Sequence, residues 1–159
     1  MGLFERFARV ESPNIELVLL PEEGHEPAFI VTVRVLSDKL NNEMVERASP
    51  NNAFDMTKFR KEWGQRVVVG WTGLTVANLR RLIPNVVIDE AKLVALYPDK
   101  MIPYTAGMAA DLHLNAVTHF RMPINEATDD ARRQQNERQD EDRRAVLGNS
   151  AGPSLSPSE

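Results

Sequence analysis

The stretch VVVGWTGLTVANLRRLIP, residues 67–84, joins an apolar run to a glycine–tryptophan pair, a second glycine and a return to helical spacing. Before it, Phe59, Trp63 and Val67 recur every four residues, so they form one apolar stripe on a helix. We predict that this helix ends near Gly70, because glycine adopts the left-handed backbone conformation that commonly closes a helix. The stretch therefore marks a boundary between two helical segments.

The tryptophan between the two glycines has two interpretations. In the first, Trp71 is a core residue, since large aromatic side chains in apolar runs are usually buried, and Gly70 and Gly73 permit a tight exit from the helix. In the second, the turn presents Trp71 and Leu74 at the rim of a groove that binds a partner. Both interpretations can hold in part.

Two strands are predicted before the helices. Residues 15–20 and 28–36 are rich in Val, Ile and Leu, and the segment PEEGHEP between them has a proline at each end and a central glycine, which bends the chain. Alternation in the second strand places two sets of side chains on opposite faces. One set is Phe29, Val31, Val33 and Val35, and the other is Ile30, Thr32, Arg34 and Leu36. We predict an antiparallel β-hairpin.

The rest of the folded part is predicted to be helical. Ser37, Asp55 and Asp89 offer side-chain oxygens that can cap the N-termini of helices. A last helix is predicted over residues 105–120, where small and apolar residues recur at three- and four-residue intervals. The predicted fold class is α+β, an N-terminal antiparallel β-hairpin packed against four or five helices.

One domain is predicted for residues 1–124, followed by a charged and Ser/Pro-rich tail at residues 125–159. Pro123 closes the folded part, and few large apolar side chains follow it. Such a segment buries too little apolar surface to offset the entropy of ordering, so we expect it to be mobile. For its first half the alternatives are a solvated helical extension or a helix that forms on a partner. At the other end, residues 3–10 predict a short amphipathic segment docked on the domain.

The composition argues against several classes of partner. The formal charge is −4 and the estimated pI is 5.5, so no net positive field attracts nucleic acid or anionic lipid. No apolar run approaches the roughly 20 residues that span a bilayer, and the first residues lack the features of a signal peptide. The absence of cysteine excludes disulfides and thiolate chemistry. We expect an intracellular protein without a membrane or nucleic-acid partner.

No arrangement of residues predicts catalysis. His113 and His119 are six residues apart, so they do not face a common metal ion from one helix. His25 lies in an acidic turn, where solvated charge is the ordinary interpretation. Glycine-rich phosphate loops, nucleophile elbows and HExxH motifs are all missing from the sequence. We therefore expect no enzyme activity, no cofactor and no metal.

The tryptophan block resembles a motif of the tail assembly chaperones of long-tailed bacteriophages. Members of that family carry V-x-G-W-x-G-L after a helix, and the corresponding residues here are Val68, Gly70, Trp71, Gly73 and Leu74. In the family a connector then leads to a capped helix with a pair of leucines. Residues 85–89 resemble that connector, and Leu93 and Leu96 resemble the pair. A strand pair before the helices and a charged tail are also similar to that family.

The resemblance implies a function without chemistry. Such chaperones bind the tape measure protein, a long, helical and aggregation-prone chain, and keep it soluble until tail tube protein polymerises around it and displaces the chaperone. The resemblance further implies work in the cytoplasm of the infected bacterial host and absence from the finished virion. In many relatives a ribosomal frameshift also produces a longer form.

A helical partner of this kind needs an apolar groove. We expect the groove between one face of the hairpin, the apolar side of residues 1–10 and the helix that follows Asp89, with the tryptophan turn as a second contact. The candidate residues are Ile30, Leu36, Trp71, Leu74, Leu93 and Leu96. Self-association of the protein stays open.

A local basic patch is the basis of an alternative function. Five basic residues lie on the two helical segments that flank the tryptophan block, and they are Arg60, Lys61, Arg66, Arg80 and Arg81. Together they favour a small regulatory or DNA-associated phage protein, although no groove-reading motif accompanies them. If they form only the solvated face of amphipathic helices, this alternative loses its support.

Overall fold

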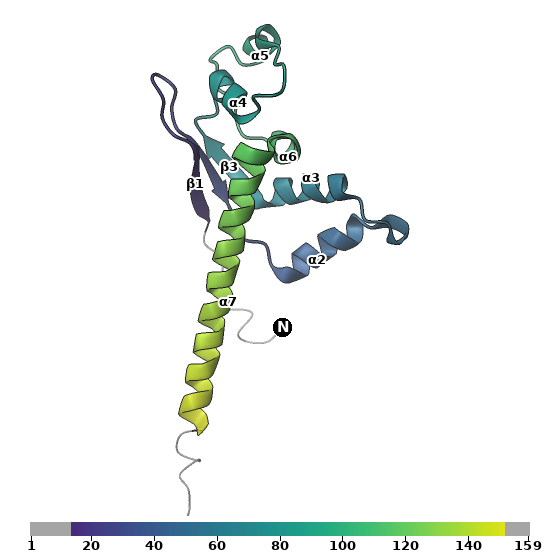
Figure 1. The fold of residues 1–159 in the computed structure, drawn as a ribbon, viewed down its shortest axis with the longest axis vertical. Helices are drawn as coiled ribbons and strands as arrows, with labels where there is room; N and C mark the ends of the chain where they lie inside the picture. The colour runs from purple at the N-terminus through teal and green to yellow at the C-terminus, as the bar shows by residue number, and fades with distance from the viewer. Residues whose placement is uncertain (1–13, 152–159) are drawn as a thin grey trace, which may run out of the picture.

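Strands from two separate parts of the chain form the sheet of this protein (Figure 1). The structure is a computed structural model and describes residues 14–151. Within that range the strands form one antiparallel sheet in the order β1–β2–β3. The strands are β1 (Ile15–Leu20), β2 (Phe29–Val33) and β3 (Val68–Thr72). The predicted hairpin corresponds to β1 and β2, in which Leu17 lies opposite Val31.

Helices account for most of the remaining described residues. The helical elements are α2 (Asp38–Arg47), α3 (Met56–Val67), α4 (Val76–Leu82), α5 (Glu90–Leu96), α6 (Ala106–Asn115) and α7 (Met122–Ala151), with the short turns η1 (Pro50–Asn52) and η2 (Val117–Arg121). The α+β class, with a hairpin that precedes the helices, is therefore confirmed.

The predicted helix starts are confirmed by their caps. The Ser37 side chain accepts a hydrogen bond from the backbone N–H of Leu40 (3.2 Å) at the start of α2. Asp55 caps α3 and Asp89 caps α5 in the same way, each with a carboxylate oxygen that accepts from the backbone N–H three residues later. These interactions are local, so a single residue type at the right place is enough to predict them.

The third strand was not predicted. Residue Val67 ends α3, and the chain passes directly into β3, so the predicted helix end near Gly70 is wrong by three residues. Trp71 lies opposite Val31 and Gly70 opposite Thr32 in the β2–β3 pair. The physical reason is a run of three valines, which favours extended backbone, beside an open edge of β2 that can accept a partner strand.

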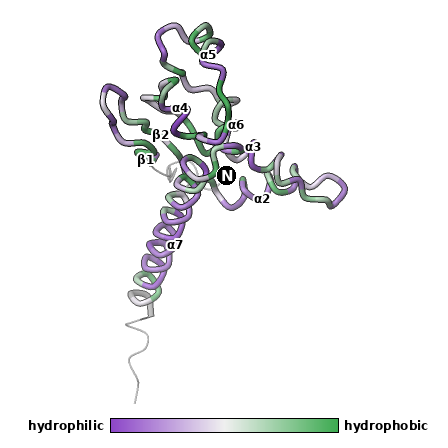
Figure 2. Tube along the Cα trace, turned by 45° about the horizontal axis from the view of Figure 1, so that its top comes forward, coloured by the Kyte–Doolittle hydropathy of each residue, from purple (hydrophilic) through white to green (hydrophobic). Residues whose placement is uncertain are grey.

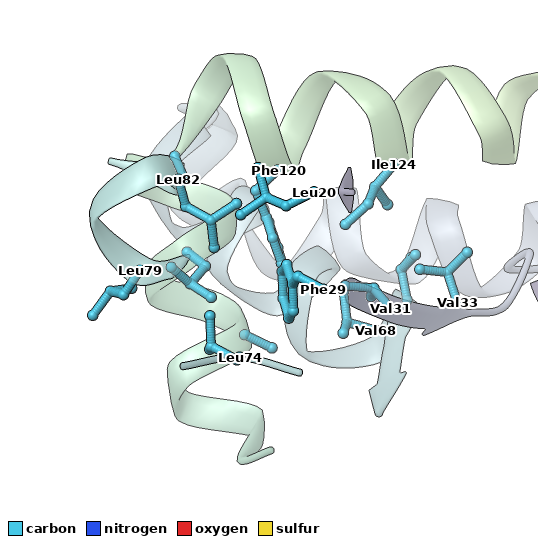
Figure 3. Close-up of a cluster of buried hydrophobic side chains, with 14 of the residues drawn as sticks. Leu20, Phe29, Val31, Val33, Val68, Leu74, Leu79, Leu82, Phe120 and Ile124 are labelled. Carbon is cyan, nitrogen blue, oxygen red and sulfur yellow. The ribbon is translucent and has the colours of Figure 1, made fainter. Parts of the chain in front are cut away.

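The core lies between one face of the sheet and the helices (Figure 3). Phe29 of β2 and Phe120 of η2 stack with their ring centroids 6.5 Å apart at its centre. Apolar side chains converge on this pair from the sheet, from α4 and from α7; they include Leu20, Val31, Val33, Val68, Leu79, Leu82 and Ile124. The strict alternation of buried and half-buried residues along β2 shows that only one face of the sheet carries the core.

Helices α3 and α6 pack closely because of a glycine. A Cβ atom at Gly64 would lie 2.7 Å from the Cβ of His113, so any larger residue would push α6 away. The single helix predicted over residues 105–120 is interrupted at Ala116, whose backbone leaves the helical region (φ −95°, ψ 75°). The π-helical turn η2 then brings Phe120 into the core.

Helix α7 crosses the domain boundary predicted after residue 124, so the first half of the predicted tail is helical. It has 30 residues, and its second half projects away from the other labelled elements (Figure 1). Most of its length is hydrophilic (Figure 2), as the alternative of a solvated helical extension requires. Pro123 does not end the fold because it occupies the first turn of α7, where a proline lacks no intrahelical hydrogen bond.

Two predictions fall on residues that the structure does not describe. The amphipathic segment predicted at residues 3–10 lies outside the described range, as does the last part of the predicted tail, residues 152–159. Among the helices of residues 14–151, none has both the length and the apolar character needed to cross a membrane.

Candidate partner-binding surface

Trp71 is anchored on one side and accessible on the other. Its ring packs edge-on against Phe29 (centroids 5.9 Å apart) and against Tyr104 (5.0 Å). Its indole Nε1 donates a hydrogen bond to the carbonyl oxygen of Ile102 (3.0 Å). The side chain is nevertheless only half-buried. The interpretation of Trp71 as a core residue therefore holds for one side of the ring, whereas binding of a partner by the other side stays a prediction.

Only one of the two flanking glycines is required by the geometry. Gly73 has a φ of +79°, and a Cβ there would lie 1.9 Å from the carbonyl oxygen of Ala28. A side chain at Gly70 would meet nothing within 4 Å, because that residue lies in the extended backbone of β3. The tight turn predicted at the tryptophan block therefore depends on Gly73, where the chain leaves the sheet.

A buried asparagine fixes this turn to the hairpin. Asn78 donates from Nδ2 to the carbonyl oxygens of Gly73 (2.8 Å) and Pro27 (2.9 Å). Its Oδ1 accepts from the guanidinium of Arg81 (3.0 Å). Next to it, the Thr75 hydroxyl donates to a carboxylate oxygen of Glu26 (2.6 Å). The turn after Trp71 is thus held on both sides by hydrogen bonds between parts distant in sequence.

Beside this turn lies an apolar hollow of about 570 Å³, called here the Trp71–Leu96 hollow. Its walls come from the end of β3, the end of α5 and the segment before α6. The lining residues are Trp71, Thr72, Gly73, Leu96, Tyr97, Pro98, Asp99, Met101, Ile102 and Pro103. Leu96 is 71% exposed and Met101 is 40% exposed. Large apolar side chains at an open hollow are a typical feature of a surface that binds a partner.

The structure brings two of the six candidate residues together. Trp71 and Leu96, which are 25 positions apart in the sequence, line the same hollow. Leu93 is half-buried and packs from α5 against the core. The assignments of Leu36 and Leu74 to a groove are corrected, because these side chains are 5% and 0% exposed and belong to the core. Leu74 is fully enclosed, whereas Leu36 also lines a second cavity, between α3 and α7, that is described below.

Ile30 lies on the other side of the sheet from this hollow. It is opposite Val18 and Thr72 in the two strand pairs, whereas Trp71 is opposite Val31 on the core face. Side chains of directly opposed residues share one face of a sheet. Ile30 does not line the Trp71–Leu96 hollow, so the predicted groove that joins Ile30 to α5 is not seen there.

Three of the five residues of the predicted basic patch form ion pairs with glutamates. Arg66 pairs with Glu62 (3.2 Å), Arg80 with Glu90 (2.6 Å) and Arg81 with Glu23 (3.0 Å). Hydrogen bonds from Arg47 and then from Arg66 hold the pKa of the Glu62 carboxyl below its ordinary value. Lys61 is exposed, and Arg60 lines a cavity at another place. Three of the five basic residues thus have carboxylate partners, which weakens the case for a nucleic-acid surface.

A second cavity was missed by the sequence reasoning. It has a volume of about 540 Å³, lies where α3, α6, η2 and α7 meet, and is called here the His113 cavity. Trp63 and His113 contact each other at its wall, with ring centroids 4.6 Å apart. Gly64 was the one signal in the sequence, because a glycine inside an apolar helix face favours close approach of another helix.

The described histidines do not belong to a cluster that could hold a metal ion. Among residues 14–151, no three His, Asp or Glu side chains lie close enough together to hold a metal ion. Burial lowers the pKa of His113 to about 4, and the neighbouring side chain of Asn125 opposes this change only in part. The ring is therefore neutral near pH 7.

Comparison of the chain with protein-family models, with curated proteins and with solved structures found no match.

Proposed function

We propose that this protein is a tail assembly chaperone of a long-tailed bacteriophage, which binds the tape measure protein and keeps it soluble in the cytoplasm of the infected host. The proposal rests on the V-x-G-W-x-G-L block at residues 68–74. The observation that supports it best is the Trp71–Leu96 hollow, because the most distinctive residue of the block lines an open apolar surface. A role in assembly only, without a place in the finished virion, completes the proposal.

The hollow suits one apolar stripe of an amphipathic helix. Trp71 supplies a rigid wall, since its indole is fixed by the hydrogen bond to Ile102. Leu96 and Met101 supply exposed apolar contacts on either side. Side chains at three- and four-residue intervals on a partner helix would insert between them. Because the hollow is open to solvent, polymerising tail tube protein has access to displace the chaperone.

The test is co-expression with the tape measure protein encoded in the same phage genome. We expect the tape measure protein to be soluble with the wild-type chaperone and insoluble with Leu96→Asp, because a carboxylate in the hollow must be desolvated when a helix binds. Val87→Asp is the matched control. Val87 is 98% exposed between α4 and α5 and does not line the hollow, so this variant should solubilise the partner as the wild type does.

A further variant tests the other face of the sheet. Val18 is 62% exposed and lies opposite Ile30, so Val18→Asp places a charge on the surface where the sequence predicted a groove. On our proposal Val18→Asp retains solubilisation. Loss of solubilisation in Val18→Asp but not in Leu96→Asp would move the binding surface to the outer face of the sheet. A tape measure protein that is equally soluble without the chaperone would end the proposal.

A further inference from the structure

The His113 cavity has the size of a small-molecule site and an unusual lining. Its volume of about 540 Å³ falls within the range of roughly 300 to 1,000 Å³ that is typical for such sites. Residues of α3 and α7 line it, and α3 runs across the direction of α7 (Figure 1). Aromatic side chains line the α3 side, namely Phe59 and Trp63, whereas Arg60, His113, Arg121 and Asn125 bring polar atoms.

His113 has hydrogen-bonding capacity that is not used. Its side chain is 2% exposed, and neither Nδ1 nor Nε2 forms a hydrogen bond of normal geometry within residues 14–151. A neutral imidazole carries one N–H donor and one acceptor nitrogen. Buried groups of this kind nearly always have partners, because a polar group that loses its water without gaining a hydrogen bond destabilises the folded state. The Trp63 ring covers one side of the imidazole without satisfying either nitrogen.

Arg121 lies in the same cavity with an equally uncompensated group. Its side chain is buried, and its Nη1 has no hydrogen-bond partner among the described residues. No ion pair joins it to a carboxylate in residues 14–151. Burial lowers the pKa of its guanidinium, and the positive charge of Arg60 lowers it further. An arginine remains protonated in spite of such changes, so the cavity contains a buried positive charge.

The charges around the cavity do not neutralise Arg121. Arg132 lines the cavity as well, but it donates to the carbonyl oxygen of Leu36 (3.1 Å) and lies 3.8 Å from a carboxylate oxygen of Asp38. Asp129 of α7 also lines the cavity, but it is exposed, so water screens its charge, and it forms no ion pair with Arg121. The wall therefore carries cationic hydrogen-bond donors next to aromatic rings. This combination favours a ligand in which an anionic group is attached to a planar or apolar group.

We propose that the His113 cavity binds an oxyanion, a carboxylate or a phosphate, carried on a planar or apolar group. The oxyanion accepts hydrogen bonds from Nη1 of Arg121 and from the N–H of His113, while the apolar body packs against Trp63 and Phe59. Arginine is suited to this task because its fork of N–H donors matches the oxygens of both groups. The site is separate from the Trp71–Leu96 hollow and does not depend on the chaperone proposal.

The test follows the side-chain nitrogens of His113 and the indole N–H of Trp63 by NMR, in the full-length protein. Benzoate, benzyl alcohol and inorganic phosphate are titrated separately, each at matched ionic strength. We expect benzoate to shift both signals saturably at millimolar concentration, and the neutral alcohol to leave them in place. If phosphate acts at lower concentration than benzoate, the ligand is a phosphate; the reverse order assigns a carboxylate on a ring.

Substitutions locate the effect. Arg121→Gln should weaken benzoate binding by about tenfold or more, because the charge-assisted hydrogen bond is lost. Arg80→Gln is the matched control, since Arg80 is an exposed arginine that pairs with Glu90 on α5, and binding should not change. If Arg121→Gln does not fold, Arg60→Gln takes its place and should weaken binding in the same direction. The proposal is overturned if neither anion shifts His113, or if benzyl alcohol shifts it as benzoate does.

Discussion

Asn78 and His113 are both buried polar residues, and they stand in opposite situations. Asn78 is 0% exposed, both of its side-chain polar atoms are bonded, and its backbone N–H donates to Thr75 (2.9 Å). His113 is almost as buried, but neither of its ring nitrogens forms a hydrogen bond of normal geometry within residues 14–151. A saturated buried group fixes the backbone around it, whereas an unsaturated one keeps capacity for a ligand. The first residue is therefore structural, and the second marks a candidate site.

Among the substitutions considered, Gly73→Ala should destabilise the protein most, because it disrupts the turn that Asn78 holds by hydrogen bonds. The new Cβ would lie 1.9 Å from the carbonyl oxygen of Ala28, and the φ of +79° strains any side chain. We expect the free energy of unfolding to fall by about 4 kcal/mol or more, measured by urea denaturation. Gly70→Ala is the control and should change it by less than about 1 kcal/mol, because nothing lies within 4 Å of the new atom. Equal effects of the two substitutions would contradict the geometry of the turn.

Asn78→Leu should have the second-largest effect and lower the free energy of unfolding by about 3 kcal/mol. It keeps the volume but leaves the carbonyl oxygens of Pro27 and Gly73 without their donor in a buried place. Asn115→Leu is the matched control. The Asn115 side chain donates to the carbonyl oxygen of Asp111 in its own exposed helix turn, so the loss there should stay below about 1 kcal/mol in the same measurement. A small effect at Asn78 would mean that water can replace its bonds.

The pH dependence of the free energy of unfolding tests whether His113 is buried as the structure shows. Because burial lowers the pKa of folded His113 to about 4 while the unfolded value is about 6.5, the unfolded chain binds more protons between these two pH values. Stability should therefore fall as the pH decreases from about 6.5 to about 4, by up to about 3 kcal/mol, and this contribution should stay constant below pH 4.

His113→Phe removes that titration and serves as the reference. The difference between the two pH profiles should contain the slope described above, as measured by urea denaturation at several pH values. A wild-type profile parallel to that of His113→Phe would show that the imidazole is solvated in the folded protein. Such a result would also remove the unsatisfied nitrogens on which the oxyanion proposal depends.

The features that the sequence predicted well are local. Ser37, Asp55 and Asp89 are caps because each bonds to a backbone group three residues away. The alternation identified the two faces correctly within Phe29–Val33, but it failed beyond the end of β2, where Leu36 is buried in the core. It did not reveal that Ile30 and Trp71 would lie on opposite faces, because that depends on the register of β3, a strand formed by distant pairing. The apolar spacing of α5 similarly could not separate half-buried Leu93 from exposed Leu96.

The His113 cavity could not be predicted for a related reason. Its walls come from α3, α6 and α7, and their mutual placement follows from the close packing at Gly64 and the break at Ala116. Neither a hydrophobic period nor a capping residue encodes such a crossing. The sequence showed His113 on a helix and left open whether its nitrogens would find partners.

Trp71→Phe should have the smallest effect on the free energy of unfolding. Trp71 lies between Asn78 and His113 in its bonding, because its one polar atom is bonded but its ring is only half-buried. The substitution removes the hydrogen bond from Nε1 to the carbonyl oxygen of Ile102 and keeps most of the edge-on packing against Phe29 and Tyr104. Because this bond is only partly buried, water can compensate the freed carbonyl, and we expect a loss of about 1 kcal/mol in urea denaturation. Tyr104→Phe is the matched control, since it removes one hydrogen bond to the carbonyl oxygen of Val68 (2.7 Å) on the same strand and should cost a similar amount.

The two variants should differ in binding of the partner, because Trp71 lines the hollow and Tyr104 does not. Weaker solubilisation of the tape measure protein by Trp71→Phe alone would assign the exposed side of the indole to the partner, whereas equal solubilisation by both would leave Trp71 a purely structural residue.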